Sequence, residues 1–237
     1  MVLQIPLTLL EQMKMIRGKI PCLESFTMKM MHISFFGSLV DSELPDDVRN
    51  VFIDAPHLQK VILYDTPKPD DYRLPLHITH LATFWGNVSN LEAYQSLVEC
   101  HFVIEEPDDS LHPIHLLNVR RLIISSSDLL SRLRLPSLDD LTISKGPGFG
   151  ADMRVIVSMM NNFVYHSRCS LTRLAIYHSI ASYDGFINDC PLLMDSLASL
   201  EIEIYWNMED VFDALASIGF LPNSQHLLLR IRSIQPP

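Results

Sequence analysis

A glycine motif is the first pattern in this sequence that could support chemistry. Gly146-x-Gly148-x-x-Ala151 follows a short apolar segment, Leu141 to Ser144, and precedes a long amphipathic stretch. Glycines between a strand and a helix are typical of dinucleotide-binding loops, where backbone N–H groups hold a pyrophosphate. Two features count against that function here. Pro147 lies inside the turn, and the next expected strand ends in Tyr177-His178, where the motif requires an acidic residue for the ribose.

An α/β enzyme that binds a nucleotide cofactor at the Gly146–Ala151 loop therefore stays open as the alternative hypothesis. A flexible connection into a helix explains the glycines equally well. Nucleotide-dependent thermal stabilisation would distinguish the two, and we expect none.

Histidine and aspartate pairs are the other candidates for chemistry. His77-x-x-His80 and His112-x-x-His115 lack the glutamate and the i, i+4 spacing of a zinc protease motif. Three aspartate pairs fall in expected loops or caps, where carboxylates are solvated and poorly suited to acid or base catalysis: Asp46-Asp47, Asp70-Asp71 and Asp108-Asp109. We therefore predict no catalytic residue, no metal site and no cofactor, and a chain that is not an enzyme.

A repeated leucine pattern indicates the elements that organise the chain. In Leu138-x-x-Leu141-x-Ile143, the last two residues alternate as they would on one face of a strand. Close copies begin at Leu58, Val119, Leu171 and Leu197, and weaker copies at Leu23, Ile78, Leu97 and Ser224. The fourth position of each copy serves as its marker, and the markers are residues 26, 61, 81, 100, 122, 141, 174, 200 and 227.

The spacing of these markers predicts a repeat fold. It averages about 25 residues, within the 20 to 29 that are typical of leucine-rich repeats. One strand with one short helix cannot bury its apolar side alone, whereas stacked copies share a core. We predict an α/β, leucine-rich-repeat-like solenoid, an irregular horseshoe of about eight or nine parallel strands. The strands should form the concave face and the helices the convex face.

The segments between the strands carry helix signals. Asp46 and Asp47 can cap a helix through Phe52, and Ser89-x-x-Glu92 is a capping box for a helix to about Leu97. Further helices are expected over 128–133, over 152–167 and between Asn207 and Gly219. We predict one leucine-rich-repeat-like domain over residues 1–237, with incomplete first and last repeats.

Composition excludes several classes of protein. With 48% hydrophobic and 19% charged residues the chain should fold, and its net charge of −10 argues against a nucleic-acid surface. The four cysteines, Cys22, Cys100, Cys169 and Cys190, have no C-x-x-C spacing, which indicates buried thiols in a reducing compartment.

The ends and the hydropathy of the chain predict its location. No apolar run is long enough to span a membrane, and the N-terminal segment lacks the basic region of a signal peptide. We expect an intracellular protein, cytoplasmic or nuclear, without membrane or nucleic-acid partners. We also expect the chain to begin partway into a longer protein, with a helix over 7–17 from an incomplete first repeat.

The repeats resemble the large fungal F-box/leucine-rich-repeat family over about residues 20–230. The similar stretches include Ala55-Pro-His-Leu-Gln-Lys-Val-Ile-Leu, Leu135-Pro-Ser-Leu-Asp-Asp-Leu-Thr-Ile and Cys169-Ser-Leu-Thr-Arg-Leu-Ala-Ile. The resemblance implies that the repeats select a protein for ubiquitination by a cullin-type ligase, while an F-box docks to the Skp adaptor. We find no F-box ahead of Leu23, so adaptor binding is expected only of a longer form.

Strand alternation predicts where a partner protein would bind. If the first, fourth and sixth positions of each copy point into the core, the third, fifth and seventh point to the concave face. We predict that Tyr64, Phe84 and Val103 form an apolar row there, beside His80 and His101, with Tyr177 further along the chain. Packing of the N-terminal segment, or of a missing domain, over this row is one alternative, and an acidic site at Glu201 and Glu203 is another.

Overall fold

The computed structural model describes residues 2–31, 46–64, 73–83, 91–103, 112–125, 128–144, 153–177, 196–204, 223 and 225–231. The chain divides into two compact units, Met1–Ser110 and Leu111–Pro237. This division does not decide whether the chain is one domain, and the single domain over residues 1–237 stays a prediction.

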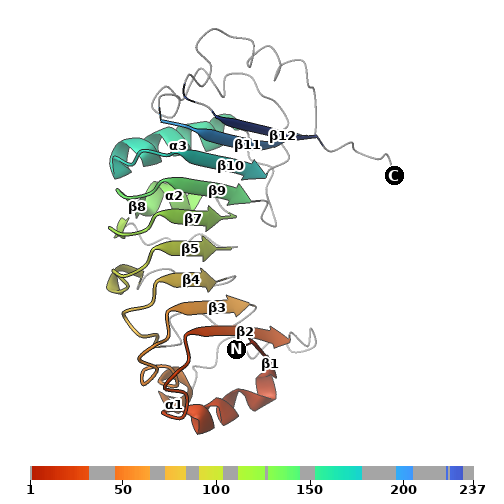
Figure 1. Cartoon of the computed structure of the whole chain (residues 1–237), viewed down its shortest axis with the longest axis vertical. Helices are drawn as coiled ribbons and strands as arrows, with labels where there is room; N and C mark the ends of the chain where they lie inside the picture. Colours follow the sequence, from red (N-terminus) through yellow and green to blue (C-terminus); the bar gives the residue numbers. More distant parts are fainter. Residues whose placement is uncertain are drawn as a thin grey trace. The chain divides into compact units, whose positions relative to one another are not determined.

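The first unit is built on parallel strands that follow one another in chain order (Figure 1). They are β1 (Val2–Pro6), β2 (Ser25–Met31), β3 (Lys60–Tyr64), β4 (His80–Thr83) and β5 (Glu99–Phe102). Each strand is parallel to the one before it. Short helical elements lie between the strands: η1 (Leu7–Ile16), α1 (Asp46–Arg49) and η3 (Leu91–Ala93).

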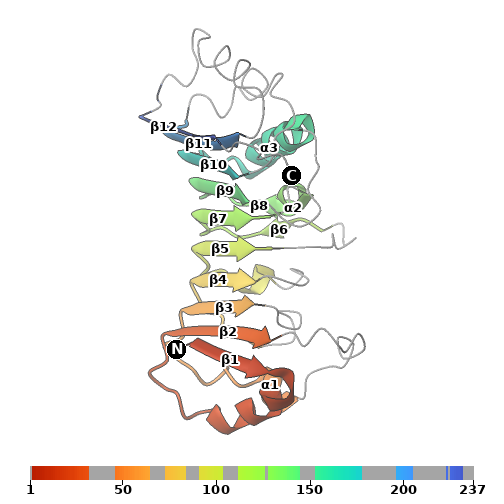
Figure 2. The ribbon, with the colours of Figure 1, turned by 90° about the vertical axis from the view of Figure 1, so that its right-hand side faces the viewer.

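The second unit repeats this arrangement. Its strands β7 (Arg121–Ile124), β9 (Asp140–Ser144), β10 (Arg173–Tyr177), β11 (Ser199–Ile204) and β12 (His226–Ile231) are neighbours in that order, and all are parallel. A second sheet pairs β6 (Ile114–His115) with β8 (Leu133–Arg134). Helices α2 (Asp128–Arg132) and α3 (Met153–Ser167) lie beside the strands, on the same side as β6 and β8 (Figure 2). The prediction of an α/β chain with parallel strands is confirmed.

The strand register agrees with the aligned repeats in both units. The marker residues are direct Cα partners of one another, in the order Phe26, Val61, Leu81 and Cys100 in the first unit, and Leu122, Leu141, Leu174, Leu200 and Leu227 in the second. Such alignment places equivalent apolar side chains above one another, so that each strand extends the core of the strand before it.

Burial follows the repeat as well. The first, fourth and sixth positions form the core, for example Leu138 just before β9 and Leu141 and Ile143 on it, which are 1% exposed or less. Leu227 is different, because its register is as predicted but its side chain is 44% exposed. The prediction of a buried core residue is wrong there. Within the described residues, β12 pairs only with β11, so no further strand extends the core over Leu227.

Helices α2 and α3 of the second unit agree with the predictions. In the first unit, the segment expected as a helix over 7–17 forms the 3-10 helix η1, and α1 ends at Arg49 rather than at Phe52. Helix α3 matches the expected 152–167, and its Ile156, Met160 and Phe163 are fully buried. The helix expected up to Leu97 is reduced to the single 3-10 turn η3, because Tyr94 N and Leu97 N donate to carbonyls three residues earlier rather than four. The helix expected between Asn207 and Gly219 lies outside the described residues.

The cysteines are partly as predicted. Cys100 and Cys169 are buried free thiols, and burial raises the pKa of both, that of Cys169 to about 11. Cys22 is exposed, so the prediction of a buried thiol is wrong for it, because Cys22 lies in the turn ahead of β2 rather than at an inward strand position. Cys190 lies outside the described residues. No helix of the described chain is long and apolar enough to cross a membrane.

Candidate functional site

The candidate site is the outer face of each unit's strands, defined as the side that carries the third, fifth and seventh positions of each repeat. On β3 the exposure alternates along the strand, with Val61 and Leu63 buried and Lys60, Ile62 and Tyr64 at least partly exposed. The strands β4, β5 and β7 alternate in the same way. On these four strands the alternation shows which side chains point away from the core, whereas on β9 and β10 the outward positions Thr142 and Ala175 are buried as well.

The predicted aromatic row of the first unit is only partly described. Tyr64 and Val103 are both partly exposed, and Val103 N donates to Thr83 O over 2.9 Å, which keeps the two strand ends aligned. Phe84, the predicted middle of the row, lies outside the described residues. The row therefore stays a prediction.

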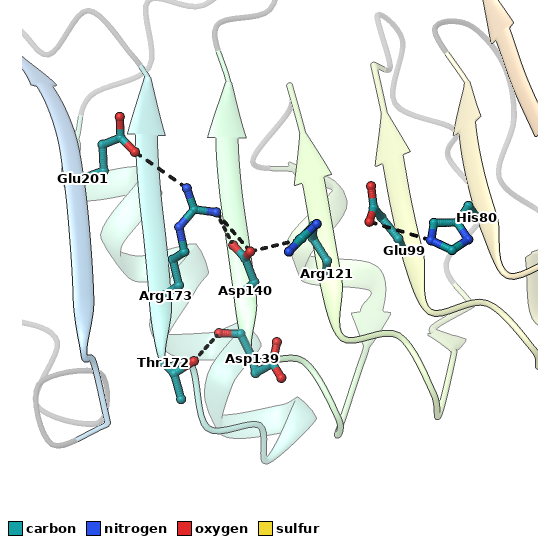
Figure 3. Close-up of polar contacts among 8 residues, drawn as sticks. All are labelled: His80, Glu99, Arg121, Asp139, Asp140, Thr172, Arg173 and Glu201. Atoms are coloured by element: carbon teal, nitrogen blue, oxygen red, sulfur yellow. Dashed lines mark hydrogen bonds and ion pairs between the residues drawn. The ribbon is translucent and has the colours of Figure 1, made fainter. Parts of the chain in front are cut away.

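The two predicted histidines of this face lie next to Glu99. His80 and Glu99 are Cα partners, and His80 Nε2 lies 3.9 Å from Glu99 Oε2 (Figure 3). Thr79 Oγ1 hydrogen bonds to His80 Nδ1 over 2.8 Å, which fixes the orientation of the ring. Burial lowers the pKa of His101, although the Glu99 carboxylate acts in the opposite direction. The structure thus brings these three residues together on adjacent strands.

The outer face of the second unit carries a row of charged side chains, of which the hypotheses from the sequence include only Glu201. We call Arg121, Asp140, Arg173, Glu201 and Arg230 the charged row. Asp140 Oδ2 accepts hydrogen bonds from Arg121 Nε and from Arg173 Nη1, each over 3.0 Å. Figure 3 shows Asp140 between these two arginines, in front of the ribbon of its strand. Because the register makes the three residues Cα partners, the strands themselves set this alternation of charge.

The row continues to the last described strand of the unit. Arg173 Nη2 lies 3.7 Å from Glu201 Oε2, and Arg230 Nε lies 2.7 Å from Glu201 Oε1, at ion-pair distance. The two acidic side chains of the row are only 10% exposed, whereas the three arginines are 43–53% exposed. Buried carboxylates of this kind require paired cations, and the arginines supply them.

Tyr177 is the predicted site residue that belongs to this arrangement. The guanidinium of Arg230 lies 5.5 Å from the centre of the Tyr177 ring, within cation–π range. Burial and a hydrogen bond to Glu201 raise the pKa of the Tyr177 phenol, while Arg230 and Arg173 oppose that shift. Tyr177 therefore lies at the edge of the charged row.

The alternative acidic site at Glu201 and Glu203 does not present exposed, unpaired carboxylates. Taken as whole residues, Glu201 and Glu203 are 7% and 5% exposed, and the Glu201 side chain lies between two arginines. A signal for the charged row was present in the sequence, since the aligned third positions of three successive repeats read Arg121, Asp140 and Arg173.

The remaining motifs give no second site within the part of the chain that the structure describes. The Gly146–Ala151 loop of the cofactor hypothesis lies outside the described residues, as do Asp70-Asp71 and Asp108-Asp109. His77 and His112 are exposed. Among the described residues, no group of three histidine, cysteine or acidic side chains is arranged to hold a metal ion.

Comparisons with known proteins add little to this geometry. No family model and no curated protein matches the chain. A crystal structure of a Bacteroides fragilis protein, a structural-genomics target, is similar with a TM-score of 0.47 and 13% identity, over 92% of this chain and 71% of that one. A likeness at this level carries no argument about function.

Proposed function

We propose that this chain is a non-catalytic protein-binding module whose partner lies on the outer face of the strands. The observation that carries the proposal is the register. Equivalent outward positions of successive repeats are Cα partners, so each unit presents rows of side chains from neighbouring strands. A surface built from several strands suits the recognition of an extended segment of another protein better than that of a small molecule.

The composition of the face supports a protein partner. Tyrosine and arginine are enriched at the centres of protein interfaces. The outer face presents Tyr64 in the first unit, and Tyr177 with three half-exposed arginines in the second.

The finer description of the fold belongs to the same proposal. We propose a leucine-rich-repeat-like solenoid, an irregular horseshoe with the outer face on its concave side and the helices on its convex side. The resemblance to fungal F-box/leucine-rich-repeat proteins suggests a role for the repeats, which is selection of the protein that a cullin-type ubiquitin ligase modifies.

Affinity capture with matched variants tests the function. The full chain is used as bait in four forms: wild type, Tyr64→Ala, Tyr177→Ala and Tyr165→Ala. Tyr165 is the control, because it is 69% exposed and lies on α3. We expect at least one outer-face variant to lose a protein that the wild type and Tyr165→Ala both retain. The proposal is wrong if the Tyr64→Ala and Tyr177→Ala variants capture the same proteins as the wild type, or if capture is lost only in Tyr165→Ala.

A further inference from the structure

We propose that the charged row binds an extended acidic segment of the partner protein, with carboxylates at alternate residues. The inference rests on the proposed function and adds the chemistry of the partner. The segment would cross the strands of the second unit, with its acidic side chains on Arg121, Arg173 and Arg230.

The arginines of the charged row are more exposed than its carboxylates, so the partner is expected to carry negative charge. Asp140 and Glu201 are only 10% exposed and lie between arginines that are about half exposed. A chain that approaches this face therefore meets guanidinium N–H groups before it meets carboxylate oxygens. Acidic side chains satisfy such groups, often through two parallel hydrogen bonds.

The arginines are held in place before a partner arrives. Arg173 Nη1 lies 3.0 and 3.2 Å from the two oxygens of Asp140, while its Nη2 faces Glu201. Arg230 contacts Glu201 through Nε and lies over the ring of Tyr177. An arginine whose conformation is already fixed loses less side-chain entropy on binding.

Donors remain for a ligand at the end of the row. A guanidinium has five N–H donors, and the ion pair to Glu201 brings only Nε of Arg230 close to a carboxylate oxygen. Within the described residues, no polar contact is found for the two Nη groups of Arg230. They can accommodate an incoming carboxylate without breaking the ion pair to Glu201.

The spacing of the arginines predicts the spacing of the acidic residues. Arg121 Nε and Arg173 Nη1 each lie 3.0 Å from Asp140 Oδ2, so the two nitrogens are within twice that distance of each other. Alternate residues of an extended chain lie about 6.6 Å apart on the same face. Acidic residues at two alternate positions would therefore come close to Arg121 and Arg173.

Direct binding of synthetic peptides to the full chain tests the inference. The probe is a fluorescein-labelled peptide with glutamate at alternate positions separated by serine, and binding is measured by fluorescence anisotropy at low and high salt. One comparison peptide has the same composition with contiguous glutamates, and another has lysine in place of glutamate. A single-stranded oligonucleotide of similar length serves as a different class of anionic ligand.

Variants assign binding to the charged row. Arg173→Ala and Arg230→Ala should each weaken binding of the alternating peptide about tenfold, because a hydrogen bond between charged groups is lost. Arg173→Lys should recover only part of the loss, since lysine keeps the charge without the planar fork. Arg120→Ala is the matched control, because it removes the same charge from an exposed residue just before β7 and should change nothing.

The outcomes separate this inference from the proposed function. Preference for the alternating peptide together with dependence on Arg173 and Arg230 supports the inference. Equal binding of both acidic peptides, an equal loss in Arg120→Ala, tighter binding of the oligonucleotide, or no peptide binding overturns it. If a captured partner still depends on Tyr64 or Tyr177 in that case, the proposed function stands without its acidic segment. If neither test shows an outer-face interaction, both are wrong.

Discussion

Arg173 and Asp140 are direct partners on adjacent parallel strands, although 33 residues separate them in the sequence, and Arg173 Nη1 lies 3.0 Å from Asp140 Oδ2. Arg121, on the other neighbouring strand, donates to the same oxygen. Asp140 therefore holds two arginines on the outer face of the second unit, and the conformation of that face depends on it.

Asp140→Asn should lower the free energy of unfolding by about 1–2 kcal/mol, because two charge-assisted hydrogen bonds to a largely buried carboxylate are weakened while the arginines remain half solvated. Urea unfolding measures this loss. The matched control is Asp139→Asn, because Asp139 is the preceding residue and takes part in the sheet through its backbone carbonyl, which accepts from Thr172 Oγ1 over 3.1 Å (Figure 3). Equal effects of the two substitutions would show that the charged row adds no stability.

Leu141→Asp should unfold the second unit. Leu141 is fully buried at a marker position, where leucine burial contributes roughly 1.5–3 kcal/mol and a buried unpaired carboxylate costs more still. Circular dichroism during heating provides the measurement. Leu117→Asp is the control, since Leu117 is 55% exposed in the same unit and should tolerate the charge. A wild-type melting curve for Leu141→Asp would refute the assigned repeat register.

His101 should make folding sensitive to mildly acidic pH. Its pKa is lowered in the folded state, so the unfolded chain binds more protons as the pH falls through the ordinary value of about 6.5. Stability should therefore decrease from pH 7 towards pH 5, and return as the pH rises. His101→Gln should remove part of this dependence in urea unfolding at several pH values. An unchanged pH profile in that variant would show that His101 does not contribute.

If the proposed role is correct, the repeats select the protein to be modified and an F-box binds the adaptor, so this repeat region should not bind the Skp adaptor. Co-purification of the isolated chain with a recombinant fungal Skp protein tests this expectation, with an intact F-box protein as the positive control. Stable association would show that the chain carries an adaptor-binding surface outside the recognised repeat pattern.

The core of this fold could be predicted from the sequence because the repeated leucine and isoleucine positions that indicate the repeats are also the side chains that fill the core. Leu141 and Ile143 recur as Leu174 and Ile176 at the same spacing, and burial requires equivalent side chains to align. The short strands β6 and β8 have no such signal, since each contains only two residues and pairs outside the main strands.

The outer face was harder to predict because its contacts join residues of different repeats. The contacts between Arg121 and Asp140 and between Arg173 and Glu201 depend on which strands are neighbours and on how far each side chain reaches. Tyr177 was predicted because aromatic residues are common at protein interfaces, and that argument does not identify Arg230, whose guanidinium lies over the Tyr177 ring. The alternating charges at aligned third positions were the available signal.

Photo-cross-linking tests the central claim, binding of a protein on the outer face, most directly. A benzophenone amino acid replaces Lys60 on β3 or Ile123 on β7, both of which point to the outer face, and replaces Tyr165 on α3 as the control. Each full-length variant is irradiated in a lysate of the organism that carries the gene, and cross-linked products are identified by mass spectrometry. We predict that at least one outer-face position gives a discrete cross-linked protein that the Tyr165 position does not. Cross-links from Tyr165 alone, or from none of the three positions, would contradict a binding function for this face.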